Sequence, residues 1–386
     1  MSNTTSNVHV NFKVDEEEGP LSYKFWLQEK ILFPSLFVLG FVTRLYPLLK
    51  YPHVGNDPFF HYEFSMALLQ GKMSMPVTIW GQHLIIYYPP LFHLFSLVFF
   101  LALPNVDPYL ILKIIVAVFD SLQLLPIYFI VKEVSHSRTG ALMGAFIAMV
   151  TPSDFNMIAW GGYTNVTGLL LIAVLAYFVI KERAVAVGIV STILFLTHHL
   201  SMLFAIAVLF PYYLIVWWRT RRIPPSLLAL VAALGVAFAV FYWQALIPQF
   251  ELYTTNASQY ATFTLPSDWT NQFDRPLLIL AAVGIGLWTY RFRLRFDKTD
   301  LFLYSWVLWP LLLGYSFLFG IRWDVVRWIY FLQQPACVWC GIAVAQFKGK
   351  YGKYAVAVIL LVFIQQWMAT IHDYYSLISL NAVNTY

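Results

Sequence analysis

Residues 166–180 read VTGLLLIAVLAYFVI, a run without one charged side chain, and Lys181 and Arg183 follow it directly. Apolar runs of about 15 to 24 residues recur along the chain, long enough to cross or nearly cross a hydrocarbon core of about 30 Å. The chain is 60% hydrophobic and 11% charged, against roughly 25% charged residues in an ordinary soluble domain. The sequence therefore predicts an all-α polytopic membrane protein and excludes a water-soluble fold.

Basic residues set the predicted topology, because cytoplasmic loops carry an excess of lysine and arginine. After the basic residues that precede the first apolar run, short basic clusters separate successive pairs of apolar segments. These clusters are Lys132/Arg138, Lys181/Arg183, Arg219/Arg221/Arg222, Arg291/Arg293/Arg295/Lys298 and Lys348/Lys350/Lys353. Because they are divided among short loops, the net charge of +5 indicates topology signals and not a nucleic-acid-binding patch.

One part of the chain does not fit this pattern, in which each basic cluster is followed by two apolar segments. Three apolar segments, at 31–49, 84–103 and 108–131, lie where the charge pattern allows two. Pro89 and Pro90 interrupt the middle segment, so we expect it to be re-entrant or to lie at the membrane interface.

The charge pattern therefore predicts about eleven transmembrane helices, with the N-terminus inside and the C-terminus outside. A twelve-span alternative would put one set of basic loops on the wrong side. Residues 1–29 are expected to form a largely disordered cytoplasmic arm without a signal peptide, because the start of the chain lacks an apolar core. Residues 30–386 are expected to form a single transmembrane domain with a first outer loop at about 50–107.

The first outer loop contains the strongest candidate for chemistry. Asp57 lies in the turn sequence GNDP, ahead of an amphipathic run from Phe59 to Gly71 that suits an interfacial helix. A carboxylate there can act as a general base or hold a metal, although it can also simply cap the helix, with Pro58 at the first position. His61 lies four residues later on the same helical face, a spacing typical of a metal ligand or base-orienting residue.

Other polar side chains gather in the remaining predicted outer loops. Arg322 and Arg327 lie at the start of the predicted tenth span, where a guanidinium can bind a phosphate through two parallel hydrogen bonds or can snorkel to the interface. Lys113 and Asp120 lie within one span and favour a polar transport pathway instead. The further candidates for substrate or metal binding are Asp154, Tyr163, Asn165, His198 and His199.

Two strings resemble the catalytic subunits of oligosaccharyltransferases. Residues 55–71, GNDPFFHYEFSMALLQG, are similar to that family's first-loop motif of Gly-x-Asp-Pro followed by two aromatic residues and His. Residues 131–165, VKEVSHSRTGALMGAFIAMVTPSDFNMIAWGGYTN, resemble its passage from a cytoplasmic turn into the second outer loop. The resemblance implies the GT-C class of membrane glycosyltransferases, which take sugars from polyprenyl-phosphate carriers of the dolichyl or undecaprenyl type.

The chain also departs from that family. Gly-Gly-Tyr163-Thr-Asn165 replaces the acidic pair of the second loop, the Trp-Trp-Asp-Tyr-Gly motif is missing, and no soluble C-terminal domain is expected. These departures favour a smaller GT-C enzyme of the cell membrane and envelope, which moves one sugar to a lipid, glycan or protein acceptor. The alternative is a transporter or lipid flippase without covalent chemistry.

The expected reaction is an inverting transfer in which Asp57 takes the proton of the acceptor hydroxyl. Arg327 or Arg322 would stabilise the lipid phosphate that leaves, or a Mg or Mn ion held by Asp57 with Asp154 or His61 would do so. Tyr163, Asn165 and His199 are the expected substrate-binding residues.

Overall fold

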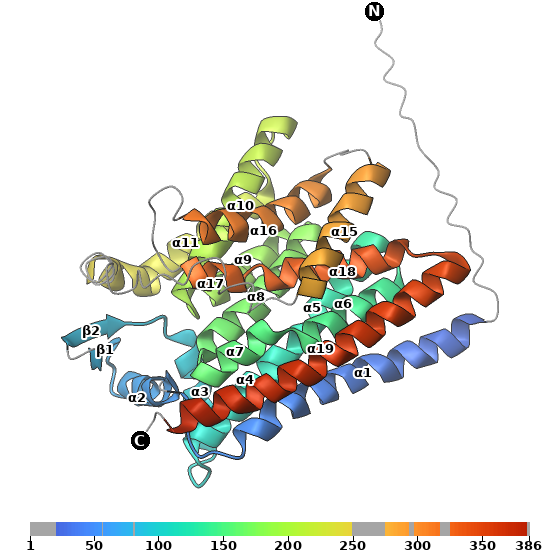
Figure 1. The fold of residues 1–386 in the computed structure, drawn as a ribbon. Helices are drawn as coiled ribbons and strands as arrows, with labels where there is room; N and C mark the ends of the chain where they lie inside the picture. The colour runs from blue at the N-terminus through green and yellow to red at the C-terminus, as the bar shows by residue number, and fades with distance from the viewer. Residues whose placement is uncertain are drawn as a thin grey trace, which may run out of the picture.

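The computed structural model describes residues 21–55, 57–79, 82–248, 275–292, 297–316 and 325–383. Within them the chain is mostly helical, as predicted (Figure 1). The helices in the first half are α1 Leu21–Leu48, α2 Asp57–Leu69, α3 Leu91–Ala102, α4 Pro108–Leu122, α5 Leu124–Ser135, α6 Arg138–Val150, α7 Pro152–Trp160, α8 Tyr163–Ile180 and α9 Ala184–Phe195. The helices in the second half are α10 His199–Thr220, α11 Pro225–Ala237, the π-helix η1 Phe238–Tyr242, α15 Arg275–Phe292, α16 Lys298–Gly314, α17 Val325–Tyr330, α18 Gln333–Gln346 and α19 Gly349–Val383.

Eight helical stretches of the described chain are long and apolar enough to cross a membrane, and several combine two successive helices. They are Glu29–Leu48, Pro108–Ser135, Arg138–Trp160, Tyr163–Ile180, His199–Thr220, Pro225–Pro248, Arg327–Gln346 and Gly349–Ala382. The protein is thus a multi-pass membrane protein. Three further predicted spans correspond to α9, α15 and α16, which fall outside these eight, so the prediction of about eleven spans stays a prediction.

The apolar segment at 84–103, which did not fit the charge pattern, is not one continuous helix. Strands β1 Ser74–Ile79 and β2 Gln82–Tyr87 form an antiparallel hairpin in which Ser74 pairs with Tyr87. After Pro89 and Pro90, α3 is only 12 residues long. The expectation of an all-α chain was therefore wrong at this hairpin, because a short apolar run such as LIIY fits a strand as well as a helix.

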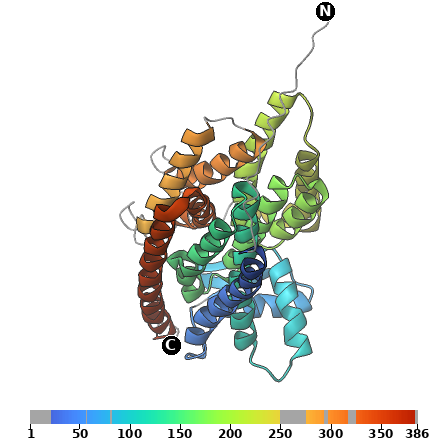
Figure 2. The same cartoon turned by 90° about the vertical axis from the view of Figure 1, so that its right-hand side faces the viewer.

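The first helix also begins earlier than expected, at Leu21. The remainder of the predicted cytoplasmic arm, residues 1–20, lies outside the described residues. In Figure 1, α2, the hairpin and the last turn of α19 lie at one end of the molecule, opposite the first turn of α1. Figure 2 shows α19 as a long helix along the side of the bundle.

Glycines let α6 and α18 pack closely in the core. A Cβ atom on Gly140 would lie 2.6 Å from the carbonyl oxygen of Gly341, and one on Gly341 would lie 2.8 Å from that of Gly140. Small residues at such crossings are the usual means by which membrane helices approach each other. This contact orders α18, the helix that follows α17 and its Arg327.

Polar side chains buried among the helices find partners across the bundle. Arg44 of α1 forms an ion pair with Asp120 of α4, both fully buried. The amide of Gln123 donates to Asp120 at 2.7 Å, and that of Gln334 donates to the Gln123 side-chain oxygen at 2.6 Å. These contacts tie α1, α4 and α18 together in a region where unpaired charges are costly.

Lys113 has a separate role in the fold. Its ammonium group donates to the carbonyl oxygens of Tyr51 and Pro52, at 2.6 and 2.8 Å. It therefore binds the backbone just after α1, while Asp120 pairs with Arg44. Among their described contacts, Lys113 and Asp120 share no partner. These contacts therefore do not support the polar transport pathway suggested by their spacing.

Candidate functional site

The N-terminus of α2 packs against the C-terminus of α7, and this contact positions Asp57. Gly161 caps the C-terminus of α7, and its φ of +95° lies in the left-handed region that glycine adopts without strain. A Cβ atom on Gly161 would lie 2.5 Å from Cδ of Pro58 and 3.1 Å from Cβ of Asp57. Only glycine therefore allows Asp57 to approach α7 this closely.

Asp57 interacts electrostatically with Arg327, which comes from the far end of the sequence. Burial raises the pKa of the Asp57 carboxyl to about 6, and the positive charge of Arg327 partly offsets this rise. The Arg327 guanidinium lies over the ring of Trp160, the last residue of α7, at 5.6 Å from the ring centroid. Helices α2, α7 and α17 thus bring a carboxyl group and a guanidinium to one place.

A pair of buried histidines lies behind Asp57. Nδ1 of His61 and Nε2 of His93 are 3.0 Å apart, and the His61 ring stacks on Tyr163 with 5.8 Å between centroids. Burial lowers the pKa of His61 to about 4 and that of His93 well below its ordinary value. Both imidazoles are consequently neutral at physiological pH, and α2, α3 and α8 meet through them.

Tyr88 connects this pair to the histidines that precede and begin α10. Its hydroxyl is 2.7 Å from that of Thr164, and its ring centroid is 5.4 Å from those of His93 and His199. Burial raises the pKa of the Tyr88 phenol, so the hydroxyl stays protonated at neutral pH. His198 caps α10 by accepting from the backbone N–H of Ser201 at 3.2 Å.

Burial lowers the pKa of His198 well below its ordinary value, with smaller contributions from His199, Arg327 and His61. The positive charge of Arg327 therefore acts on the histidine group as well as on Asp57. The site combines one carboxyl group, one guanidinium and several neutral hydrogen-bonding rings. Such a set suits a substrate with a phosphate and a polyhydroxyl part.

The predicted site residues differ in how the structure places them. Asp57, His61, Tyr163, His199 and Arg327 belong to the group just described, and their roles stay predictions. Asn165 is buried in the first turn of α8, at 8% exposure. Arg322 lies outside the described residues.

Asp154 lies in the first turn of α7, whereas Asp57 contacts the other end of that helix. Its carboxylate accepts a hydrogen bond from the Gln333 amide and interacts with the charge of Arg44. Across the described ranges, no three His, Cys, Asp or Glu side chains are grouped to hold a metal ion. The described contacts of Asp154 therefore do not support its pairing with Asp57, and the Mg or Mn requirement stays a prediction.

Sequence reasoning missed Tyr88, His93 and Thr164. His93 had a signal, because an ionisable side chain within an apolar segment is a functional candidate by default. Tyr88 precedes the Pro89-Pro90 break and is one of 24 tyrosines, so nothing in the sequence distinguished it.

Comparisons with known proteins find likeness in structure only. No protein-family model and no curated protein sequence matches the chain. Over 93% of its length, the chain aligns with the Archaeoglobus fulgidus oligosaccharyltransferase tethered to an acceptor peptide with an NVT sequon, at a TM-score of 0.57 and 16% identity. The same enzyme in complex with zinc and sulfate aligns over 91% of the chain, at a TM-score of 0.56 and 15% identity.

ArnT from Cupriavidus metallidurans, bound to undecaprenyl phosphate, aligns over 93% of the chain with a TM-score of 0.56 and 14% identity. The chain has a GT-C-like membrane fold. This GT-C-like fold confirms the resemblance stated from the sequence, and at such low identity the likeness extends to the fold alone. The chain spans about half the length of the oligosaccharyltransferase, with 55% and 53% of it aligned, and 76% of ArnT.

Proposed function

We propose that the protein is a glycosyltransferase that moves a sugar from a polyprenyl-phosphate carrier to an acceptor at the outer face of the membrane. The observation that carries this proposal is that a buried carboxyl, Asp57, and a guanidinium, Arg327, both lie against the C-terminal end of α7 and interact electrostatically, in a GT-C-like fold. One neighbour was solved with undecaprenyl phosphate and the other with an acceptor peptide, which supports a lipid-phosphate donor. The cell membrane is the proposed location.

The proposed reaction is a single inverting displacement. Asp57 takes the proton of an acceptor hydroxyl while the acceptor oxygen forms a bond to the anomeric carbon. The bond from that carbon to the phosphate oxygen breaks, and the polyprenyl phosphate leaves with the electron pair. A base with a pKa of about 6 is mostly ionised at neutral pH yet remains able to accept a proton, as general-base catalysis needs.

Arg327 is the proposed phosphate ligand. Its guanidinium can form two parallel hydrogen bonds to phosphate oxygens, and stacking on Trp160 restricts its orientation before the donor binds. The neutral rings of His61, Tyr163 and His199 and the side chain of Asn165 are proposed to contact the sugar and acceptor. A Mg or Mn ion on Asp57 would supply charge stabilisation at the same phosphate.

The test is sugar transfer in liposomes, with a panel of polyprenyl-phosphate sugars. We expect wild type to transfer sugar and Asp57→Asn to lose activity by at least about 100-fold, because the base is gone. Glu63→Gln is the matched control, since Glu63 is an exposed carboxylate on the same helix. Equal activity of Asp57→Asn and wild type would refute the proposed base.

Adding a chelator to the same assay distinguishes a general-base role of Asp57 from a metal-binding role. Loss of wild-type activity in chelator, restored by Mg or Mn, would assign a metal to the site. Donor movement across the bilayer without any transfer product would instead support the transporter alternative.

A further inference from the structure

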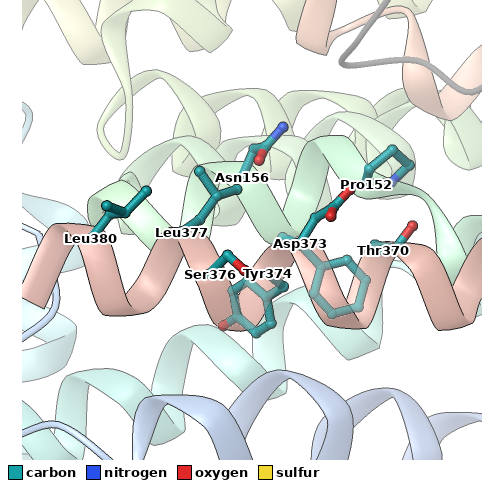
Figure 3. Close-up of a pocket in the computed structure, with 9 residues that line it drawn as sticks. Pro152, Asn156, Thr370, Asp373, Tyr374, Ser376, Leu377 and Leu380 are labelled. Carbon is teal, nitrogen blue, oxygen red and sulfur yellow. The ribbon is translucent and has the colours of Figure 1, made fainter.

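A cavity lies outside the candidate site, between α7 and α19. It is a groove of about 340 Å³, within the range of about 300 to 1,000 Å³ usual for small-molecule sites. Figure 3 shows Asp373 and Leu377 directed from α19 toward α7, where Pro152 and Asn156 lie. The groove is therefore built by two helices that are far apart in the sequence.

Two hydrogen bonds hold the walls of this groove in place. The buried Tyr374 hydroxyl donates to the backbone oxygen of Arg44 at 3.0 Å. Farther along α19, the Asn381 amide donates to the backbone oxygen of Ala159 at 2.8 Å. This second bond places the outer end of the groove beside the last turn of α7, at the end of the molecule that carries the candidate site.

One polar side chain of the groove has no described partner. Thr370 is 3% exposed and lines the groove, and among the described residues its hydroxyl makes no hydrogen bond. A buried hydroxyl without a partner costs free energy, so a ligand that bonds to it would be stabilised. Thr370 is thus an independent sign that the groove binds a polar group.

The lining identifies the kind of polar group. The Asn156 amide and the Thr370 hydroxyl can both donate and accept hydrogen bonds. The Ser376 hydroxyl, which donates to the backbone oxygen of His372, and the Asp373 carboxylate can accept them. Leu377 and Leu380 add apolar surface beside these groups. No lysine or arginine is among the described lining residues, so the lining offers no permanent positive charge to a phosphate. A sugar ring, with hydroxyl groups at its edge and apolar faces, matches this mixture.

The surroundings indicate that the sugar belongs to a lipid. On the same face of α19 as Asp373, the apolar side chains of Val362, about three turns earlier, and Leu380, about two turns later, are 38% and 62% exposed. In a membrane these side chains face acyl chains. A lipid lying along them would bring its head group to Thr370 and Asp373.

We infer that the groove between α7 and α19 binds the uncharged sugar head group of a membrane glycolipid, in the leaflet on the side of the candidate site. This inference does not depend on the proposed glycosyl transfer. It predicts selection between lipids with the same tails and different head groups.

The experiment uses the full chain in phosphatidylcholine nanodiscs that contain equal small amounts of monoglucosyl-diacylglycerol and phosphatidylglycerol. Native mass spectrometry then measures which lipid stays bound. We expect wild type to retain the glucosyl lipid preferentially, and Thr370→Val or Asn156→Leu to reduce this preference about 10-fold, through the loss of one hydrogen-bonding group. Thr192→Val on α9, distant from the groove, is the control.

Thermal unfolding gives a second readout, because the stability of Thr370→Val relative to wild type should differ in sign without and with glycolipid. Without glycolipid, Thr370→Val should be at least as stable as wild type, because it removes a buried hydroxyl without a partner and keeps the side-chain shape. With glycolipid, wild type should gain stability and Thr370→Val should not. Preferential retention of phosphatidylglycerol, or an unchanged preference in Thr370→Val, would overturn the inference.

Discussion

At the scale of single residues, the environment of Asp57 distinguishes it from an ordinary helix-capping aspartate. A carboxylate that only caps a helix accepts backbone N–H bonds near the positive end of the helix dipole, and both effects lower its pKa. Here burial holds the pKa of Asp57 near 6 while Arg327 opposes the rise. The ionised form is therefore disfavoured by burial and favoured by the neighbouring guanidinium.

This balance predicts the pH dependence of transfer. The base must be ionised, so kcat/KM should rise with pH up to about 6 and level off above it. In Arg327→Gln the favourable charge is lost, so the midpoint should move to higher pH. Measuring kcat/KM from acid to neutral pH in both proteins checks the direction, and a midpoint that moves to lower pH in Arg327→Gln would contradict the pairing.

At the scale of helices, the candidate site depends on the joint between α2 and α7. Gly161→Ala would place a methyl group against Pro58 and force an L-residue to φ of +95°. We expect a loss of about 1 to 3 kcal/mol in stability, because both strain and the clash act at this joint. Thermal or denaturant unfolding in detergent measures it.

Gly235→Ala in α11 is the matched control, since a Cβ there meets nothing within 4 Å. It should be neutral or stabilise the helix by up to about 1 kcal/mol. If both variants unfold alike, the α2–α7 joint does not need a glycine.

At the scale of the whole molecule, the charge pattern predicts which end faces outward. Cys337 and Cys340 are free and buried, so wild type should not react with a membrane-impermeant maleimide. Glu63→Cys should be labelled from outside intact cells, and Arg222→Cys only after the membrane is opened. The reverse pattern would invert the predicted orientation and move the candidate site to the cytoplasmic face.

The sequence by itself determined the class of fold. Long apolar runs must satisfy their backbone groups internally in lipid, and helices do so locally, so composition and run length suffice. It also identified Asp57 and the GT-C resemblance, because both rest on a short contiguous string. It did not identify the β1–β2 hairpin, since four apolar residues fit either a strand or a helix.

Only the tertiary structure decided which side chains meet. Asp57 and Arg327 interact because α7 lies between their helices, and His61 reaches His93 because α2 packs on α3. The groove with Thr370 exists because Tyr374 and Asn381 tie α19 to α1 and α7. Such contacts join residues far apart in the chain, and a hydropathy or charge pattern carries no information about them, because it depends on neighbours in sequence and not on neighbours in space.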